Sequence, residues 1–229
     1  MSTFGSKKIV CALCGKESEF NIIMSTNEFG SRDLDTRPAE MRRSTMSLWV
    51  QECPECGYIS SNVSDKTSIN REYLNSVAYK TCDSTDFKSG LAQRFYKKYM
   101  INLVDNDVKG AFWASLHAAW ASDDASDFNN AKQCRKKSLA LIEKMEDYAD
   151  KNMLYAMKAD LLRRSDQFDE VVKLYEVSCV EDEHLDQIIK FEVERAKAND
   201  NKCYTIEDTL FDRTTTEKKG FFKRLFKKK

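Results

Sequence analysis

The chain has 229 residues, of which 32% are charged and 41% are hydrophobic, and its formal net charge is zero. These proportions exclude a mostly disordered chain and a chain built of membrane spans, and the length allows one small module beside a larger domain. The neutral total conceals an asymmetry, because Glu217–Lys229 hold seven basic residues and one acidic residue. The rest of the chain is therefore mildly acidic.

The sequence also bears on the compartment of the protein. No apolar run approaches the roughly 18 residues that suggest a membrane span. The first eight residues, Met1–Lys8, lack the apolar stretch of a secretory signal. We therefore expect a cytoplasmic protein, whose thiols stay reduced. The eight cysteines then need an explanation other than disulfide bonds.

Four cysteines occur as two matching pairs. The first pair reads Cys11-Ala-Leu-Cys14-Gly, and the second, separated from Cys14 by 38 residues, reads Cys53-Pro-Glu-Cys56-Gly. Two residues between thiolates let one turn direct both sulfurs at one ion, and four thiolates fill a tetrahedral zinc shell. The glycine after each pair suits a turn that needs positive φ. We expect Cys11, Cys14, Cys53 and Cys56 to hold one structural Zn²⁺ ion.

Two other readings of the cysteine pairs stay open at this point. Paired turns of this kind also resemble rubredoxin, which holds iron for electron transfer, although the long insertion between the pairs differs from that compact protein. Either pair alone could be a redox dithiol, but that motif normally occurs once, at the start of a helix. Zinc is the reading that the spacing favours.

The N-terminal segment up to about Ser64 has the composition of short β segments joined by turns. Phe20–Met24 and Ser47–Gln51 carry β-type residues and predict strands. The insertion between the cysteine pairs contains Asp33 and Asp35, which could be read as an acid/base pair or a second metal site. The simpler interpretation is a solvated loop whose acids and arginines pair with each other.

These N-terminal motifs together resemble those of a bacterial family of unknown function. The matching features are the two cysteine pairs, Ser31-Arg32-Asp33, Asp35, Trp49 and the run Cys53–Tyr58. In that family a zinc ribbon is followed by tetratricopeptide-like helices, so the resemblance implies an architecture but no activity. Where the family pattern often has Cys-Pro, this chain has Arg37-Pro38, so no role for a fifth cysteine carries over.

From about Asp65 the period of the apolar residues changes to that of helices. Phe87, Leu91, Phe95, Tyr99 and Leu103 recur every four residues, and Asp83 or Ser84 is the expected cap of this helix. Further helices are expected at about 66–80, 108–122, 127–147, 151–164, 167–180 and 182–199. The predicted fold is α+β and mostly α, with a zinc ribbon (1–64), an antiparallel tetratricopeptide-like array (65–200), a linker (201–216) and a basic tail (217–229).

An internal repeat supports the helical array. Phe128, Ala131 and Ser138 align with Phe168, Val171 and Ser178, 40 residues later. The large and small residues at these spacings resemble the tetratricopeptide hairpin. Stacked hairpins of this kind form a concave groove for peptides or helices. The residues expected on that groove are Ala114, Ala118, Ser122, Ala156, Asp160, Arg163 and Arg164.

The C-terminal tail has an amphipathic pattern. In a helix Phe221, Phe222, Leu225 and Phe226 would share one face, flanked by Lys223, Arg224 and Lys227. This arrangement is typical of helices that lie on anionic lipid. A tail that only solubilises the chain, or that folds onto its acidic body, is the competing interpretation.

Three functions compete on this sequence. The favoured one is a non-enzymatic zinc-binding adaptor whose helices bind a protein partner and whose tail brings it to the inner face of the membrane. A nucleic-acid-binding ribbon could use Arg32, Arg37, Arg42 and Arg43, but the acidic body opposes that electrostatic attraction. An enzyme is disfavoured, because the chain lacks a phosphate-cradling glycine loop, a nucleophile elbow and a histidine-rich metal site. His117, on a helix among alanines, is expected to be a packed residue.

Overall fold

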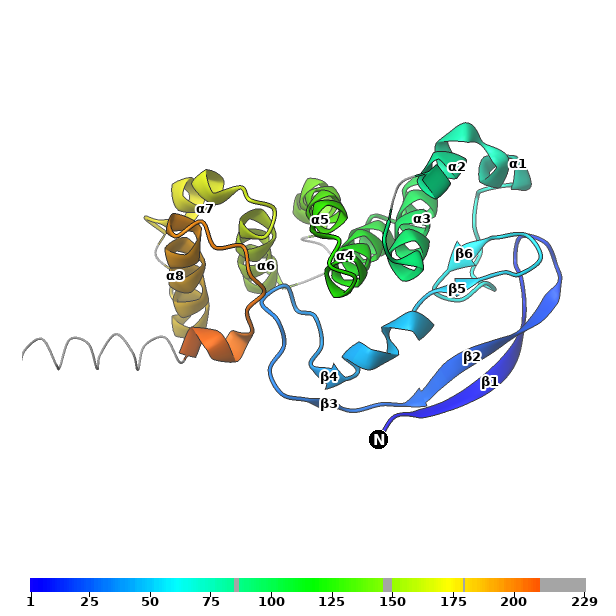
Figure 1. Cartoon of the computed structure of the whole chain (residues 1–229), viewed down its shortest axis with the longest axis horizontal. Coiled ribbons are helices and arrows are strands. Elements are labelled where there is room, and N and C mark those ends of the chain that lie inside the picture. The colour runs from blue at the N-terminus through cyan, green and yellow to red at the C-terminus, as the bar shows by residue number, and fades with distance from the viewer. Residues whose placement is uncertain (85–86, 146–149, 179, 211–229) are drawn as a thin grey trace, which may run out of the picture. The chain divides into compact units, whose positions relative to one another are not determined.

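The computed structural model describes residues 1–84, 87–145, 150–178 and 180–210 (Figure 1). They form two compact units. The N-terminal unit consists of residues 1–29 and 40–154, and the C-terminal unit consists of residues 30–39 and the chain from residue 155 onward. The expected boundary at residue 64 coincides with neither unit. Only residues 30–39 of the insertion between the cysteine pairs belong with the C-terminal helices, and the rest of the insertion belongs to the N-terminal unit.

Three antiparallel strand pairs make up the β part. The long hairpin joins β1 (Thr3–Val10) and β2 (Glu17–Ser25). Two short pairs follow, β3 (Glu28–Phe29) with β4 (Glu40–Met41) and β5 (Gln51–Glu52) with β6 (Ile59–Ser60). The strand predicted at Phe20–Met24 lies within β2 and is confirmed.

The strand predicted at Ser47–Gln51 is largely wrong. A 3-10 helix, η1 (Arg43–Leu48), covers its first two residues, and only Gln51 lies in a strand. A side-chain hydrogen bond from Trp49 Nε1 to Thr45 Oγ1, 3.0 Å long, reaches back over this turn. The β-type composition at Leu48 and Trp49 reflects half-buried packing, which a 3-10 turn provides as well as a strand does.

Helices fill the rest of the N-terminal unit. Short helices α1 (Arg71–Asn75) and α2 (Val77–Ser84) precede α3 (Gly90–Val104), α4 (Val108–Asp124) and α5 (Phe128–Ile142), and a 3-10 turn, η2 (Glu143–Met145), follows. Helix α4 packs against both α3 and α5, which gives the antiparallel array that the sequence predicts. The predicted caps Asp83 and Ser84 belong to α2. The cap of α3 is Ser89, whose side chain accepts a hydrogen bond from the Ala92 N–H.

The C-terminal unit is built on three helices. They are α6 (Lys151–Arg163), most of which lies in this unit, α7 (Phe168–Tyr175) and α8 (Glu183–Lys197), and α7 packs on α8. The expected helices are present, although α7 ends five residues before the predicted boundary at 180. The α+β, mostly α fold is thereby confirmed.

One turn geometry recurs at the ends of four helices. A residue with positive φ follows α3, α4, α6 and α8, and in each case two main-chain hydrogen bonds close the turn, as in a Schellman motif. The four residues are Asn106, Ser126, Asp166 and Asn199. Short polar side chains tolerate this left-handed conformation better than other non-glycine residues do. Ser126 and Asp166 are 40 residues apart, which matches the repeat in the sequence.

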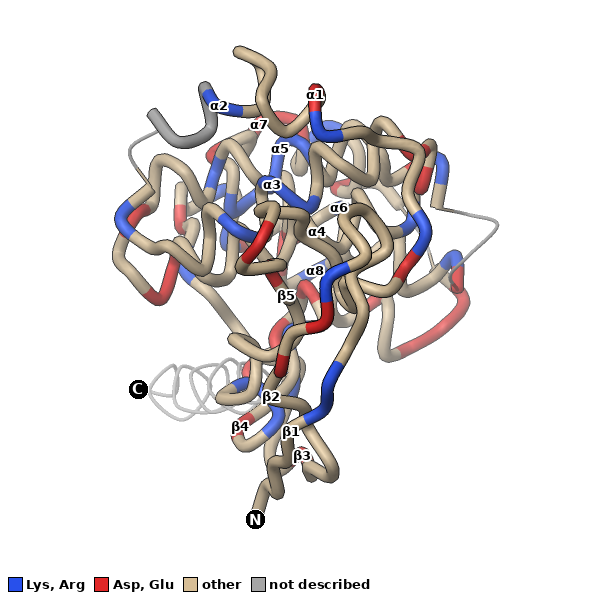
Figure 2. Tube along the Cα trace, turned by 90° about the vertical axis from the view of Figure 1, so that its right-hand side faces the viewer, with Lys and Arg blue, Asp and Glu red and all other residues tan. Residues whose placement is uncertain are grey.

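The interiors of the helical segments are apolar and small. Ala111, Ala114, Ala118 and Ala131 have exposed fractions of at most 1%, so neighbouring helices approach closely at these positions. Figure 2 shows Lys and Arg interspersed with Asp and Glu along the helices. None of the helices in the described ranges combines the length and the apolar composition that a bilayer crossing requires.

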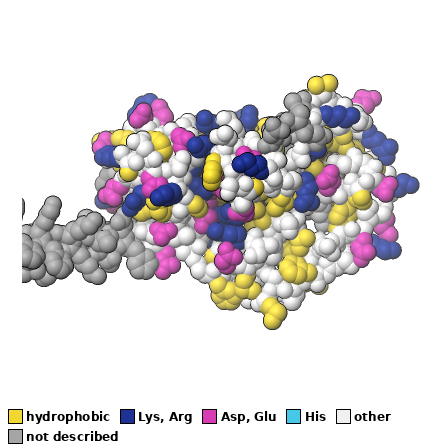
Figure 3. Space-filling model, viewed as in Figure 1, with side chains coloured by type: hydrophobic (Ala, Val, Ile, Leu, Met, Phe, Trp, Pro, Cys, Tyr) yellow, Lys and Arg dark blue, Asp and Glu magenta, His cyan; other side chains and the backbone are white. Residues whose placement is uncertain are grey.

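The β1–β2 hairpin and β3 are more exposed. Phe4, Met24 and Phe29 have exposed fractions of 57%, 66% and 61%. Figure 3 shows hydrophobic side chains at the end of the N-terminal unit that carries these strands. An isolated two-stranded ribbon is marginally stable in water, so the hairpin depends on what holds its ends.

Candidate metal centre

The two cysteine pairs sit in two turns of the same construction. In each turn the first cysteine accepts a hydrogen bond from the glycine N–H and donates its own N–H to the carbonyl two residues after the second cysteine. The distances are 2.9 Å for Gly15–Cys11, 2.9 Å for Cys11–Lys16, 2.9 Å for Gly57–Cys53 and 2.8 Å for Cys53–Tyr58. Both pairs therefore present their side chains from equivalent positions.

The two glycines are required by the backbone. Gly15 has φ of 71° and Gly57 has φ of 74°, the left-handed region that disfavours other residues. Nothing lies within 4 Å of a β-carbon placed on either glycine, so a substitution there would be disfavoured by conformation rather than by crowding. This matches the reason for which the sequence predicted both turns.

The four sulfurs gather at one point. The Sγ atoms of Cys11, Cys14, Cys53 and Cys56 all lie within 4.8 Å of one another. Cys11 Sγ is 3.7 Å from Cys56 Sγ, and Cys14 Sγ is 3.7 Å from Cys53 Sγ. A disulfide would hold two sulfurs about 2.05 Å apart. The edge of a zinc–thiolate tetrahedron with 2.3 Å bonds is about 3.8 Å, so the arrangement fits a tetrahedral ion.

In each pair the first cysteine is more deeply buried than the second. Cys11 and Cys53 have exposed fractions of 2% and 1%, whereas Cys14 and Cys56 are only partly covered. Burial raises the pKa of the Cys11 and Cys56 thiols, while a hydrogen bond from the Lys16 main chain lowers the pKa of Cys14. A cation between the sulfurs would favour the thiolate form that metal ligation requires.

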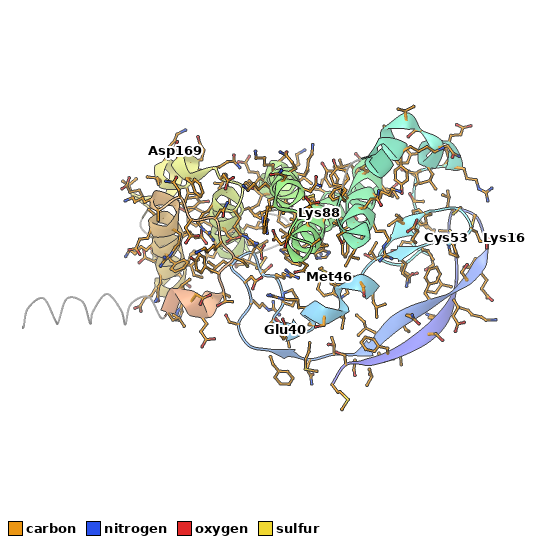
Figure 4. The ribbon with its side chains drawn as sticks, in the orientation of Figure 1. Lys16, Glu40, Met46, Cys53, Lys88 and Asp169 are labelled. Carbon is orange, nitrogen blue, oxygen red and sulfur yellow. The ribbon has the colours of Figure 1, made fainter. Side chains whose placement is uncertain are left out.

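The surrounding strands fix the two turns to each other. Strand β1 ends directly before Cys11, and β6 begins directly after Tyr58. The Ala12 N–H donates to the Val63 carbonyl at 2.8 Å, which joins the first turn to the segment after β6. The Val63 N–H in turn donates to Gln51 Oε1 at 3.1 Å. Figure 4 shows Lys16 and Cys53 at the same end of the N-terminal unit.

The other cysteines do not join this cluster. Cys134 is 1% exposed in α5, and burial raises the pKa of its thiol to about 12, so it is an inert packed thiol. Cys203 donates from Sγ to Asp33 Oδ2 at 3.3 Å. The side chains of Cys82 and Cys179 lie outside the described part of the chain.

The insertion between the cysteine pairs is not the solvated loop that the sequence suggested. Asp33, Asp35 and Arg37 have exposed fractions of 2%, 0% and 6%. The Leu34 N–H donates to the Tyr204 carbonyl at 2.9 Å, and Arg164 Nη1 donates to Asp35 Oδ2 at 2.8 Å. The acids of the loop therefore pair with Arg164, directly after α6, and with Cys203, next to Tyr204, which the local sequence does not reveal.

Segment 201–210 correspondingly differs from the plain linker that was expected at 201–216. Thr205 forms a bridge with Asp33, and the Ile206 N–H donates to the Arg32 carbonyl at 2.9 Å. Phe191 of α8 packs edge-on against the Tyr204 ring, with centroids 5.0 Å apart. This segment is thus part of the folded C-terminal unit.

Arg163 lies at the centre of a buried charge cluster. It is 0% exposed and donates to Glu192, to Asp160 at 2.8 Å and to the carbonyls of Asp200 and Lys202 at 2.9 and 2.8 Å. Burial alone would lower the pKa of this guanidinium, but the two carboxylates raise it. The whole cluster consists of Asp35, Asp160, Arg163, Arg164 and Glu192.

Burial raises the pKa values of two carboxyl groups in this cluster. Burial, reinforced by the charge of Glu192, raises the pKa of Asp160 to about 8 despite the neighbouring arginines. Burial also raises the pKa of Glu192, although Arg163 opposes this effect. Three carboxyl groups face two guanidinium groups, so a retained proton brings the cluster to charge balance.

The predicted partner groove is wrong. Ala114, Ala118, Ser122, Ala156, Asp160, Arg163 and Arg164 all have exposed fractions of at most 8%. The small residues lie where helices approach closely, and the charged ones form the buried cluster just described. The pattern of small and charged residues suggested an exposed surface. Inside the protein, the small residues instead allow close helix packing and the charged residues pair with each other.

His117 is surrounded by aromatic rings. Its ring centroid lies 5.2 Å from Trp49, 5.1 Å from Phe95 and 4.9 Å from Trp120. The helical array and the segment between η1 and β5 thus share one aromatic cluster. The prediction of a packed histidine agrees with this environment.

The arginines assigned to nucleic-acid binding do not form one exposed set. Arg37 is buried, and Arg42 lies 3.9 Å from Glu28 in an ion pair. The residues expected at an anionic membrane surface, from Phe221 to Lys227, lie outside the described residues.

Comparisons with known proteins identified no relative from which a role for the site could be inferred. No protein-family model matches the chain, and neither the search of curated proteins nor the search of solved structures found a match. Among the described residues, the four cysteines are the group of metal-ligating side chains that could hold an ion.

Proposed function

We propose that this protein is a non-catalytic adaptor whose N-terminal turns are held by one zinc ion and whose folded units present a binding surface to a protein partner. The observation that carries the proposal is the convergence of four free thiols from two matching turns, with sulfurs 3.7 Å apart in two pairs. A structural zinc ion bound there supplies folding energy to the two turns and the short strands beside them.

A structural role is favoured over a catalytic one by the donor set. Four thiolates fill a tetrahedral shell, whereas catalytic zinc sites use three protein ligands and keep one position for water or substrate. Main-chain N–H groups of the two turns face the sulfurs and stabilise their charge. Iron could occupy the same four thiolates, so the identity of the metal is part of the test.

The metal test uses the purified full-length chain. We expect about one equivalent of zinc in the wild type and loss of that zinc in Cys53→Ser. Cys203→Ser, the same substitution at a thiol outside the cluster, is the matched control and should retain zinc. Far-ultraviolet circular dichroism should show the helices largely retained in Cys53→Ser, because only the turns depend on the metal. A zinc-free wild type, or zinc retained by Cys53→Ser, would contradict the proposal.

The adaptor is further proposed to reach anionic membrane surfaces through its tail. Each basic residue near such a surface contributes about 1 kcal/mol, and the tail carries several beside four large apolar residues. Sedimentation with liposomes should pellet the full-length chain only when anionic lipid is present, and a chain ending at Thr216 should remain in the supernatant. Equal pelleting of both chains would remove this part of the proposal.

A further inference from the structure

A cavity of about 560 Å³ lies beside the metal centre, between the long hairpin and the second cysteine turn. On one side it is lined by Glu19–Asn21 of β2, and on the other by Val50–Cys53 in and around β5. Pro54 and Gly57 of the cysteine turn and Arg94 of α3 complete its wall. All of these residues belong to the N-terminal unit. Its volume is within the range of ligand-binding pockets.

The cavity follows strand edges rather than strand faces. Successive side chains of a strand point to opposite faces, so a cavity over one face would be lined by alternate residues. Here three consecutive residues of β2 and four consecutive residues at β5 all line it. Both strands therefore present their main chain to the same space.

Each of these two edges is unpaired among the described residues. Strand β2 is bonded to β1 on one side, and β5 is bonded to β6 on one side, in two separate two-stranded sheets. Figure 1 shows β2 as the strand of the hairpin on the side of β5 and β6. Free strand edges carry N–H and C=O groups that accept a further strand.

The charged residues of the cavity are also without partners among the described residues. Glu19 and Glu52 are exposed and make no ion pair, and Arg94 makes none either. Lys8 lies opposite Glu19 in the hairpin register, but its ion pair, 3.6 Å long, is with Glu17. Two carboxylates against one guanidinium give the cavity a negative balance. Phe20, Leu48 and Val50 supply an apolar wall.

From these observations we infer that the cavity binds an extended segment of a partner protein, inserted as a strand between β2 and β5. The segment carries basic residues that pair with Glu19 and Glu52 and an apolar residue that packs against Phe20 and Val50. At about 3.3 Å per residue, the edges accommodate about three to four residues. Main-chain hydrogen bonds supply affinity and the side chains supply specificity, as in other cases of strand addition.

This inference rests on the proposed function, because Cys53 and Gly57 both line the cavity and belong to the turn that zinc holds. Zinc therefore fixes one wall of the binding slot. A nucleic acid strand is disfavoured in the same place, since Glu19 and Glu52 would repel its phosphates.

The test begins with selection of random twelve-residue peptides displayed on phage against zinc-loaded, full-length protein. Sequences with basic residues alternating with apolar ones are expected to be enriched. A synthetic peptide of the enriched sequence should bind Glu19→Lys/Glu52→Lys at least 10-fold more weakly than the wild type. Glu17→Lys lies on the same strand and outside the cavity, and should bind within about 2-fold of the wild type.

A second measurement separates insertion from attachment to a single edge. In a slot with two edges, consecutive N–H groups of the peptide point alternately to β2 and β5, so N-methylation of either of two adjacent central residues should weaken binding. Attachment to one edge makes binding sensitive at only one of them, and that result would overturn the insertion. Absence of any enriched sequence, or equal binding to the double variant, would overturn the site itself.

Zinc content is measured on the same samples. A zinc-free wild type would contradict the proposed function, whereas a zinc-loaded protein that selects no peptide would contradict only the binding slot.

Discussion

The protein contains two polar clusters that are built on opposite principles. At the cysteine turns, four thiols face one another, and main-chain N–H groups of the turns donate to them. In the C-terminal unit, Arg163 and Arg164 contact the carboxyl groups of Asp35, Asp160 and Glu192 directly. The first cluster consists of donors that could hold a cation, and the second carries its own cations.

The difference shows how sequence encodes each kind of cluster. A metal site needs its ligands at fixed short spacings, because one turn must direct two sulfurs at one ion. An ion-pair cluster needs only complementary charges that tertiary packing brings together from distant parts of the chain. Such charges have no characteristic spacing in the sequence. The first cluster can therefore be predicted from the sequence, whereas the second cannot.

The largest effect is expected from removal of the central arginine. Arg163→Met leaves Glu192 and the Asp200 and Lys202 carbonyls without their buried donor, and breaking a buried ion pair in this way costs about 3–5 kcal/mol. Urea unfolding should report this loss of stability, with zinc content unchanged. Arg71→Met, at an exposed position of α1, is the control and should change stability by less than about 0.5 kcal/mol. Equal stability of the two variants would show that the cluster is not integral to the fold.

A smaller, pH-dependent effect is expected from Asp160. Its pKa is raised in the folded state, so its contribution to stability is complete below the unfolded pKa and is lost as the pH rises toward about 8. One group with this shift lowers stability by at most about 1.4 kcal/mol per pH unit within that window. Asp160→Asn cannot titrate and should remove this slope.

The measurement is a series of urea unfolding curves at pH 5.5, 6.5 and 7.5 on wild type and variant. The stability of Asp160→Asn relative to wild type should rise with pH. Asp169→Asn, an exposed residue at the start of α7, should follow the wild type at every pH. Parallel curves for wild type and Asp160→Asn would contradict the assignment of the retained proton.

Much of the fold follows from local pattern. The four-residue period predicted α3, and the 40-residue repeat predicted that Phe128 and Phe168 begin corresponding helices. The exact end of α3 and start of α4 were not predicted, because they depend on the left-handed turn at Asn106, which only the structure shows. Local propensity acts over a few residues, and these elements depend on little else.

The parts that were not predicted depend on distant partners. Asp35 pairs with Arg164, and Leu34 pairs with Tyr204, so the loop that carries them cannot be recognised as buried from its own polar composition. The same fact explains the wrong groove, since Asp160 and Arg163 look like surface residues until Glu192 is placed beside them. The two aspartates of the loop and the consecutive Arg163 and Arg164 are present in the sequence, but nothing in their spacing indicates that they pair.

The central claim is that one zinc ion bound by four thiolates completes the first of the two clusters. X-ray absorption at the zinc edge of the purified full-length protein tests it most directly. The account predicts about one zinc per chain with four sulfur neighbours at about 2.3 Å. Nitrogen or oxygen neighbours in the first shell, or iron in place of zinc, would contradict it.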